Sequence, residues 1–105
     1  MVLLELIQMR CSEREADRVK VFLQDVQGRF RDSGVLSWRL FTSADFEGDL
    51  LIAIYYESED LDKYGSKVGH WLSRELKAFC LINRSIWQAD HLPDRPEIDS
   101  FSPQT

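Results

Sequence analysis

One β-forming segment, apolar on two sides, constrains the fold more than any other feature of the chain. Leu50 to Glu57 is almost continuous in apolar side chains. Successive side chains of a strand point to opposite faces of a sheet. One face then carries Leu50, Ile52 and Ile54, and the other carries Leu51, Ala53 and Tyr55. A strand with this pattern is expected in the centre of a sheet, covered on both faces.

The N-terminal third predicts a strand followed by an amphipathic helix. Val2 to Arg10 is rich in Val, Leu and Ile, as strands are. Ser12 then begins a helix, and Glu15 three residues later completes the pattern of a capping box. Spacings of three and four place one apolar stripe on this helix: Ala16, Val19, Phe22, Leu23, Val26 and Phe30. Gly34 is expected to close the helix in a left-handed conformation.

The remaining elements are a hairpin, a second helix and a last strand. Val35 to Thr42 alternates as a strand does, with Leu36, Trp38 and Leu40 on one face, and a polar connection leads to Leu50 to Glu57. From Ser58 an acidic start leads into a second apolar stripe: Leu61, Tyr64, Val68, Leu72, Leu76 and Phe79. Gly65 and Gly69 weaken this helix, and a break is expected near Gly65 and Ser66. Asn83 to Ala89 is the fourth predicted strand.

The order β-α-β-β-α-β predicts an α+β fold. Two helices can pack together on one side of a four-stranded antiparallel sheet, which gives a ferredoxin-like sandwich. We expect one domain over residues 1–92 and a C-terminal tail over residues 93–105, where three prolines and polar residues replace the strand pattern.

A sheet with both helices on one side leaves its other face open. Whichever face of this sheet meets the helices, the opposite face is substantially apolar. Exposing so much apolar surface is unfavourable, so a second copy laid face to face is expected to cover it. Glu5, Arg39 and Arg84 interrupt otherwise apolar strands. They are expected between the two sheets, either at the rim of a dry dimer interface or around a ligand cavity.

Composition and charge exclude several classes of function. Lys and Arg number 13 against 18 Asp and Glu, for a net charge of −5, so nucleic-acid binding is not expected. No apolar run spans a bilayer, and no secretory signal is evident. No Cys and His cluster has the spacing of a metal site. With no export signal, the two cysteines, Cys11 and Cys80, are expected as reduced thiols in a cytoplasmic protein. The alternative is a redox pair, if both lie at the same end of the sheet.

The length, the element order and a degenerate motif resemble the dimeric α/β-barrel superfamily, particularly its antibiotic-biosynthesis-monooxygenase-like domains. Tyr56-Glu57-Ser58, Leu61, Tyr64 and His70 follow in order the family's pattern at the join of the third strand and second helix. The resemblance covers about residues 2 to 90. The resemblance implies a ferredoxin-like chain that forms a dimeric α/β barrel. Members of this family include oxygenases that act on polycyclic phenols without a cofactor, so the resemblance implies no cofactor here.

His70 is the candidate catalytic residue, since a histidine near its ordinary pKa can accept a proton from a phenol. The candidate ligand-binding residues are Trp38, Arg39, Tyr56, Trp71 and Trp87. The aromatic side chains would wall a flat ligand and Arg39 would anchor an acidic or phenolate group. The alternative is a surface histidine beside a packed tryptophan, with the other aromatic residues in the core or the dimer interface.

Two functions from different classes follow. The first is a homodimeric small-molecule-binding protein that resembles cofactor-independent monooxygenases acting on aromatic substrates. The second is a dimeric binding or interaction module without catalysis. An open pocket lined by His70, Arg39 and an aromatic side chain would favour the first, and a filled space between the sheets would favour the second.

Overall fold

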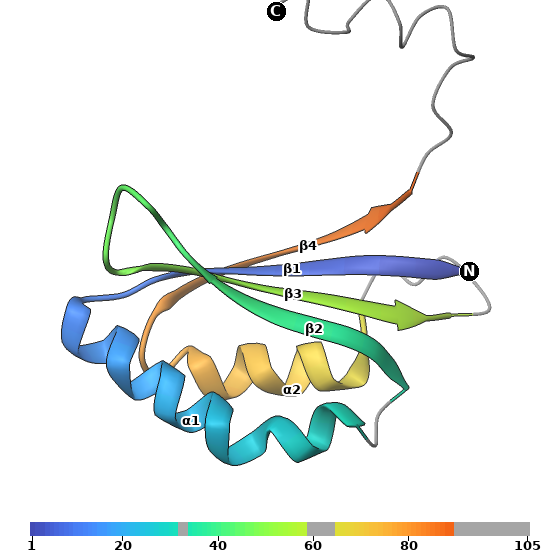
Figure 1. Ribbon diagram of the computed structural model, residues 1–105, viewed down its shortest axis with the longest axis horizontal. Coiled ribbons are helices and arrows are strands. Elements are labelled where there is room, and N and C mark those ends of the chain that lie inside the picture. The colour runs from blue at the N-terminus through green and yellow to red at the C-terminus, as the bar shows by residue number, and fades with distance from the viewer. Residues whose placement is uncertain (32–33, 59–64, 90–105) are drawn as a thin grey trace, which may run out of the picture.

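The elements occur in the order that the sequence predicts. A computed structural model describes residues 1–31, 34–58 and 65–89. The elements are β1 (Val2–Arg10), α1 (Glu13–Arg31), β2 (Val35–Thr42), β3 (Asp49–Glu57), α2 (Lys67–Leu76) and β4 (Leu81–Gln88). The predicted α+β ferredoxin-like topology is confirmed (Figure 1). The tail over residues 93–105 lies outside the described residues, as do residues 59–64.

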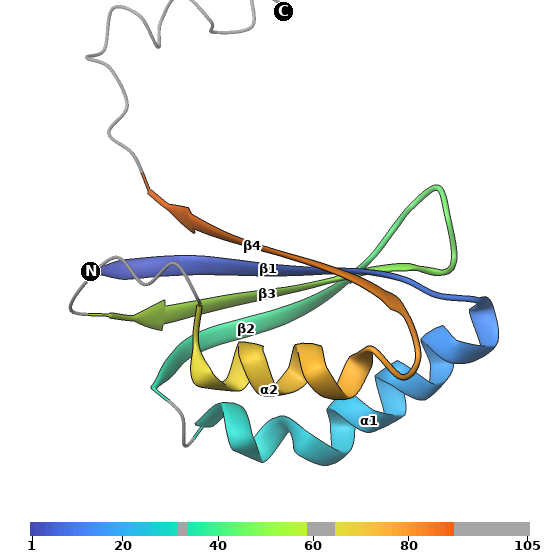
Figure 2. The same ribbon diagram turned by 180° about the vertical axis from the view of Figure 1, so that it is seen from behind.

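The sheet is antiparallel throughout, with the strand order β2-β3-β1-β4. Both helices lie on one side of it, and none of the described elements lies on the other side (Figures 1 and 2). β3 is an interior strand, as its apolar pattern predicts. Within one chain, however, the helices cover only one of its two faces.

α1 begins and ends where the sequence predicts. The Ser12 hydroxyl accepts a hydrogen bond from the Glu15 backbone N–H at 3.2 Å, which satisfies one of the free donors of the first turn. Ala16, Val19, Leu23 and Phe30 of the predicted stripe are buried. Gly34 has a φ of 76°, in the left-handed region that glycine enters without steric cost.

α2 begins at Lys67, just after the residues at which the sequence predicts a break. Ser66 caps it, with its hydroxyl accepting from the Gly69 N–H at 2.9 Å. Gly65 just before the cap has a φ of 83°, so the chain turns sharply into the helix there. The helix thus begins just after the predicted break, and Leu61 and Tyr64 of the predicted stripe lie outside the described residues.

β2 departs from simple alternation. Its register against β3 shifts between Val35 and Ser37. Leu36 is consequently exposed, while Trp38 turns toward the helices and stacks on Phe30 with 4.2 Å between ring centroids. The expectation that Leu36 shares a face with Trp38 is wrong, because an irregularity in one strand resets the side-chain alternation that follows.

The two cysteines form a disulfide, so the expectation of reduced thiols is wrong. Cys11 follows β1 and Cys80 precedes β4, with Cα atoms 4.7 Å apart. The last pair of the β1–β4 ladder is Arg10 opposite Leu81, which places the two cysteines one step beyond it. The bond joins residues 69 apart in the sequence, and only the pairing of the two strands reveals it.

No helix in the described part of the chain is long and apolar enough to cross a bilayer.

Candidate functional site

The sheet face that the helices leave uncovered, termed the open face, carries one apolar half. In the ladders, Leu4 lies between Tyr55 of β3 and Trp87 of β4, and Leu6 lies between Ala53 and Ser85. Trp87 is 56% exposed and Tyr55 is 44% exposed. Apolar side chains of three neighbouring strands therefore lie together on this half.

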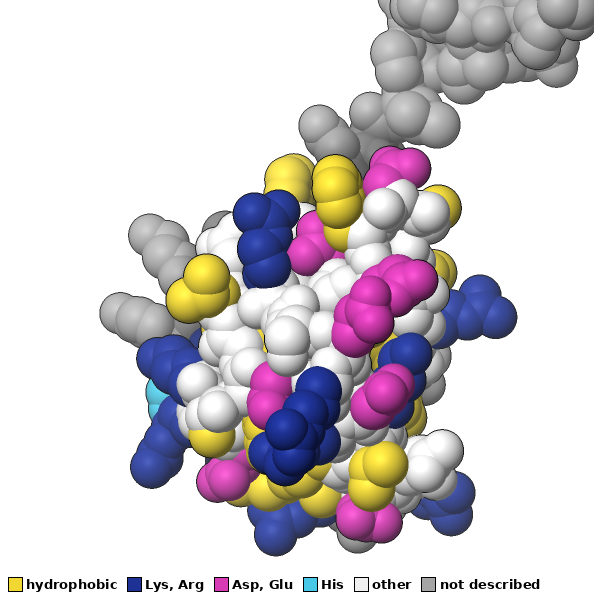
Figure 3. Space-filling model, turned by 90° about the vertical axis from the view of Figure 1, so that its left-hand side faces the viewer, with side chains coloured by type: hydrophobic (Ala, Val, Ile, Leu, Met, Phe, Trp, Pro, Cys, Tyr) yellow, Lys and Arg dark blue, Asp and Glu magenta, His cyan; other side chains and the backbone are white. Residues whose placement is uncertain are grey.

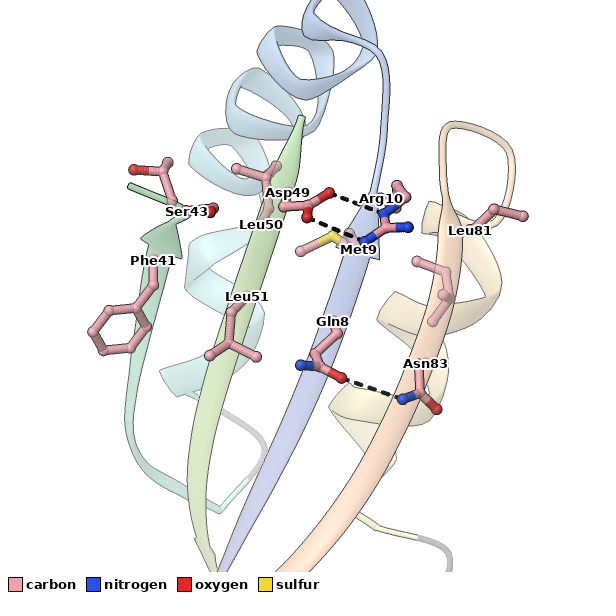
Figure 4. A pocket seen from close by; sticks show the side chains of 12 residues that line it. Gln8, Met9, Arg10, Phe41, Ser43, Asp49, Leu50, Leu51, Leu81 and Asn83 are labelled. Carbon is pink, nitrogen blue, oxygen red and sulfur yellow. Dashed lines mark hydrogen bonds and ion pairs between the residues drawn. The ribbon is translucent and has the colours of Figure 1, made fainter. Parts of the chain in front are cut away.

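The other half of the open face is polar and hollow. The Asn83 side-chain N–H donates to the side-chain carbonyl oxygen (Oε1) of Gln8 at 3.2 Å. One step further along the sheet, the Arg10 guanidinium binds the Asp49 carboxylate at 3.2 and 3.5 Å. Both pairs lie across neighbouring strands, as Figure 4 shows. The polar groups at this end therefore already hold one another in place.

A concavity of about 560 Å³ opens over this polar half. Phe41, Leu51 and Leu81 supply apolar wall, and Gln8 and Arg10 supply the polar groups (Figure 4). The hairpin between β2 and β3 rises away from the helices at this end of the sheet (Figure 1), and its first residues line the concavity. Its volume lies within the range of small-molecule sites, roughly 300 to 1,000 Å³.

A second hollow lies between this hairpin and the start of α1, where acidic side chains gather (Figure 3). A hydrogen bond with Glu47 and the charge of that residue raise the pKa of the Glu13 carboxyl above its ordinary value. Both carboxylates face water, where such interactions are weak. Among residues 1–31, 34–58 and 65–89, no three His, Cys, Asp or Glu side chains are placed to hold a metal ion.

Glu5 is a fully buried carboxylate on the helix side of the sheet. It accepts hydrogen bonds from the Ser66 N–H at 2.9 Å and the Ser66 hydroxyl at 2.8 Å. The Arg84 Nε–H donates to its other oxygen at 2.7 Å, and a second guanidinium nitrogen binds the same atom. The expectation that Glu5 and Arg84 lie between two sheets is wrong, since both face α2 and anchor its first turn.

Three of the predicted ligand-binding residues belong to the helix side. Trp38 stacks on Phe30, and Tyr56 is buried on the same side of the sheet. The ring centroids of Trp71 and Phe22 are 5.8 Å apart, and the Arg29 guanidinium lies 4.1 Å from the centroid of the Trp71 ring. These contacts make the three side chains part of the layer between the sheet and the helices and of the seam between α1 and α2.

The other three predicted residues are divided between two surfaces. Arg39 and Trp87 lie on the open face. His70 is exposed on α2, whose buried residues are on another side of the helix. The sheet therefore separates His70 from Arg39, and one chain does not place them in one pocket. The role of each of the six residues stays a prediction.

Sequence reasoning did not single out the concavity of the polar half. Gln8 and Asn83 lie on strands far apart in the sequence, and their pairing follows only from the β1–β4 register. The register of β1 against β4 is the signal that would have placed the amides of Gln8 and Asn83 opposite each other on the open face.

No family model matches the chain, and no curated protein matches it. Solved structures do. A Mycobacterium tuberculosis protein, Rv0793, superposes with a TM-score of 0.66 at 14% identity over 90% of this chain and 100% of its own. A proposed antibiotic biosynthesis monooxygenase from Deinococcus radiodurans gives 0.64 at 15% identity over 90% of this chain and 98% of its own. SnoaB, a cofactor-independent oxygenase from Streptomyces nogalater, superposes with a TM-score of 0.58 at 13% identity, over 89% of this chain and 98% of its own.

These similarities are similarities of fold. The chain has the ferredoxin-like fold of antibiotic-biosynthesis-monooxygenase-like proteins, as its motif and element order indicate. Because one fold hosts many functions, the activity has to be argued from the surfaces described above.

Proposed function

We propose that the protein is a homodimeric small-molecule-binding protein that acts like a cofactor-independent monooxygenase on an aromatic substrate. The observation that carries the proposal is the open face, whose apolar half has no cover within the described chain. Two structural neighbours support it: one is called a cofactor-independent oxygenase and another, from an uncultured marine organism, a dimeric ferredoxin-like protein.

The size of the open face fits a second copy that covers nearly all of it. Four strands of eight or nine residues span roughly 27 by 19 Å, or about 500 Å² before side-chain relief is counted. A standard interface buries about 800 Å² of accessible surface on each partner. A two-fold arrangement brings Trp87, Leu4 and Tyr55 of one copy against the partner, which removes the exposed parts of Trp87 and Tyr55 from water.

His70 serves as the proton acceptor in this proposal, since it is the only histidine among the described residues and a neutral imidazole can accept a proton. Trp38 and Tyr56 pack on the same side of the sheet as His70, and Trp71 packs at the seam of the helices. Arg39 and Trp87 contribute on the open face, where the partner copy approaches.

A second candidate is a dimeric binding module without catalysis. The separation of His70 from Arg39 by the sheet favours it, because a proton acceptor has to lie within hydrogen-bond reach of the substrate that the other groups hold. The two candidates share the dimer and differ in turnover.

Oxygen uptake with 1-naphthol as the probe separates the two candidates. A monooxygenase converts the naphthol and O₂ to the naphthoquinone and water, so that one oxygen atom enters the ring and the other leaves as water. We expect uptake by the wild-type protein, a loss of about a hundredfold in His70→Ala, and no change in Lys67→Ala, an exposed neighbour on the same helix. Uptake equal to that without protein contradicts the monooxygenase and leaves the binding module.

A further inference from the structure

We infer that the concavity over the polar half of the open face is a binding site for a small, neutral, flat molecule that carries a carbonyl oxygen. The inference rests on the proposed dimer, because within one chain the concavity is open to solvent on one side. Its recognition chemistry, however, comes from side chains that one chain already holds in place.

The Gln8 amide supplies the hydrogen bond that selects the ligand. Its carbonyl oxygen is engaged by Asn83, so the bond fixes which end of the amide is free. The amide nitrogen points toward Leu51, into the concavity (Figure 4). Within the described residues this NH₂ group makes no hydrogen bond of its own. A donor presented beside apolar side chains favours a ligand with an acceptor oxygen.

The charges at the site favour a neutral ligand. Arg10 is the only cation among the described residues that line the concavity, and the Asp49 carboxylate engages it through two contacts. An anionic ligand would gain Arg10 only at the expense of that pair, and it would lie next to the Asp49 charge. A neutral carbonyl compound meets neither cost.

The walls favour a flat apolar body. Leu51 lies beside Gln8, Phe41 stands on the neighbouring strand, and Leu81 closes the β4 side (Figure 4). Phe41 is 44% exposed and Leu81 is 76% exposed, so a ligand between them would remove apolar surface from water. A partner copy laid on the open face would close the remaining side and add to that burial.

Titration with 1-indanone, and with indane as the analogue that lacks the carbonyl, tests the site by amide chemical shifts. We expect 1-indanone to bind the wild-type dimer more tightly than indane. Gln8→Met, which keeps the length of the side chain and removes the amide, should weaken 1-indanone about threefold to tenfold and leave indane unchanged. Gln24→Met, the same change on the exposed face of α1, is the matched control and should change neither.

Equal affinity of 1-indanone for the wild type and Gln8→Met would overturn the site. The absence of 1-indanone binding at millimolar concentration would also overturn it, because partner side chains would then fill the concavity. Benzoate binding more tightly than 1-indanone would overturn it as well, because the site would then select an anion. Sedimentation of the same samples separates this inference from the proposed function. A dimer that fails to bind contradicts only the site, whereas a monomer contradicts the proposed function.

Discussion

Replacing Glu5 with leucine is expected to lower the free energy of unfolding by about 3 kcal/mol or more, because it removes a buried carboxylate that a largely buried guanidinium binds. The Arg84 guanidinium, with 22% of its side chain exposed, would lose the carboxylate that it binds. The Ser66 N–H and hydroxyl would lose the acceptor that fixes the first turn of α2. Urea denaturation followed by circular dichroism measures the change.

Two variants identify the buried pair as the cause. Glu75→Gln removes a carboxylate from the exposed side of α2 and should change the free energy of unfolding by less than about 0.5 kcal/mol. Glu5→Leu combined with Arg84→Met removes both charges and should recover much of the loss, since apolar replacements of a buried pair are often neutral. A single Glu5→Leu variant as stable as the wild type would contradict the assignment.

Removing the disulfide is expected to lower the free energy of unfolding by between about 2 and 4 kcal/mol, because a cross-link over a long loop restricts the unfolded chain. The bond joins Cys11 to Cys80 across 69 residues. Dithiothreitol should therefore shift the urea midpoint of the wild type to lower concentration. A thiol titration before and after reduction shows whether the bond was present.

The double variant Cys11→Ala with Cys80→Ala separates the cross-link from other effects of the reductant. Its urea midpoint should not respond to dithiothreitol, and its stability should lie close to that of the reduced wild type. A wild-type protein that titrates with two free thiols, or whose midpoint does not move on reduction, would contradict the bond.

Local patterns predicted most of the fold because they act within a few residues. The Ser12 and Glu15 cap, the apolar stripe of α1 and the left-handed Gly34 all follow from short-range rules, and the structure contains each of them. The break before α2 followed in the same way from Gly65. The two-sided apolar pattern of β3 correctly predicted an interior strand.

The features that sequence reasoning missed depend on strand register. Neither the disulfide nor the pairing of Gln8 with Asn83 can be foreseen without aligning β1 against β4. The face on which Glu5 and Arg84 lie depends on which side the helices take, and an apolar pattern on both sides leaves that choice open. The shift in β2 similarly moved Leu36 away from Trp38.

The candidate site was harder to predict than the fold, for a related reason. His70 and Arg39 were grouped because both residue types suit a phenol, although the elements that carry them lie on opposite sides of the sheet. The concavity over the polar half is built by paired amides and ordinary leucines. Those residues carry no motif and gain meaning only from their position.

Sedimentation equilibrium of the wild-type protein tests the central claim, that a second copy covers the open face. We expect a particle of twice the 12.3 kDa chain at micromolar concentration. Leu6→Asp, at the centre of the open face, should give a folded monomer, whereas Val21→Asp on the exposed side of α1 should remain dimeric. A folded wild-type monomer of 12.3 kDa at every concentration would contradict the claim.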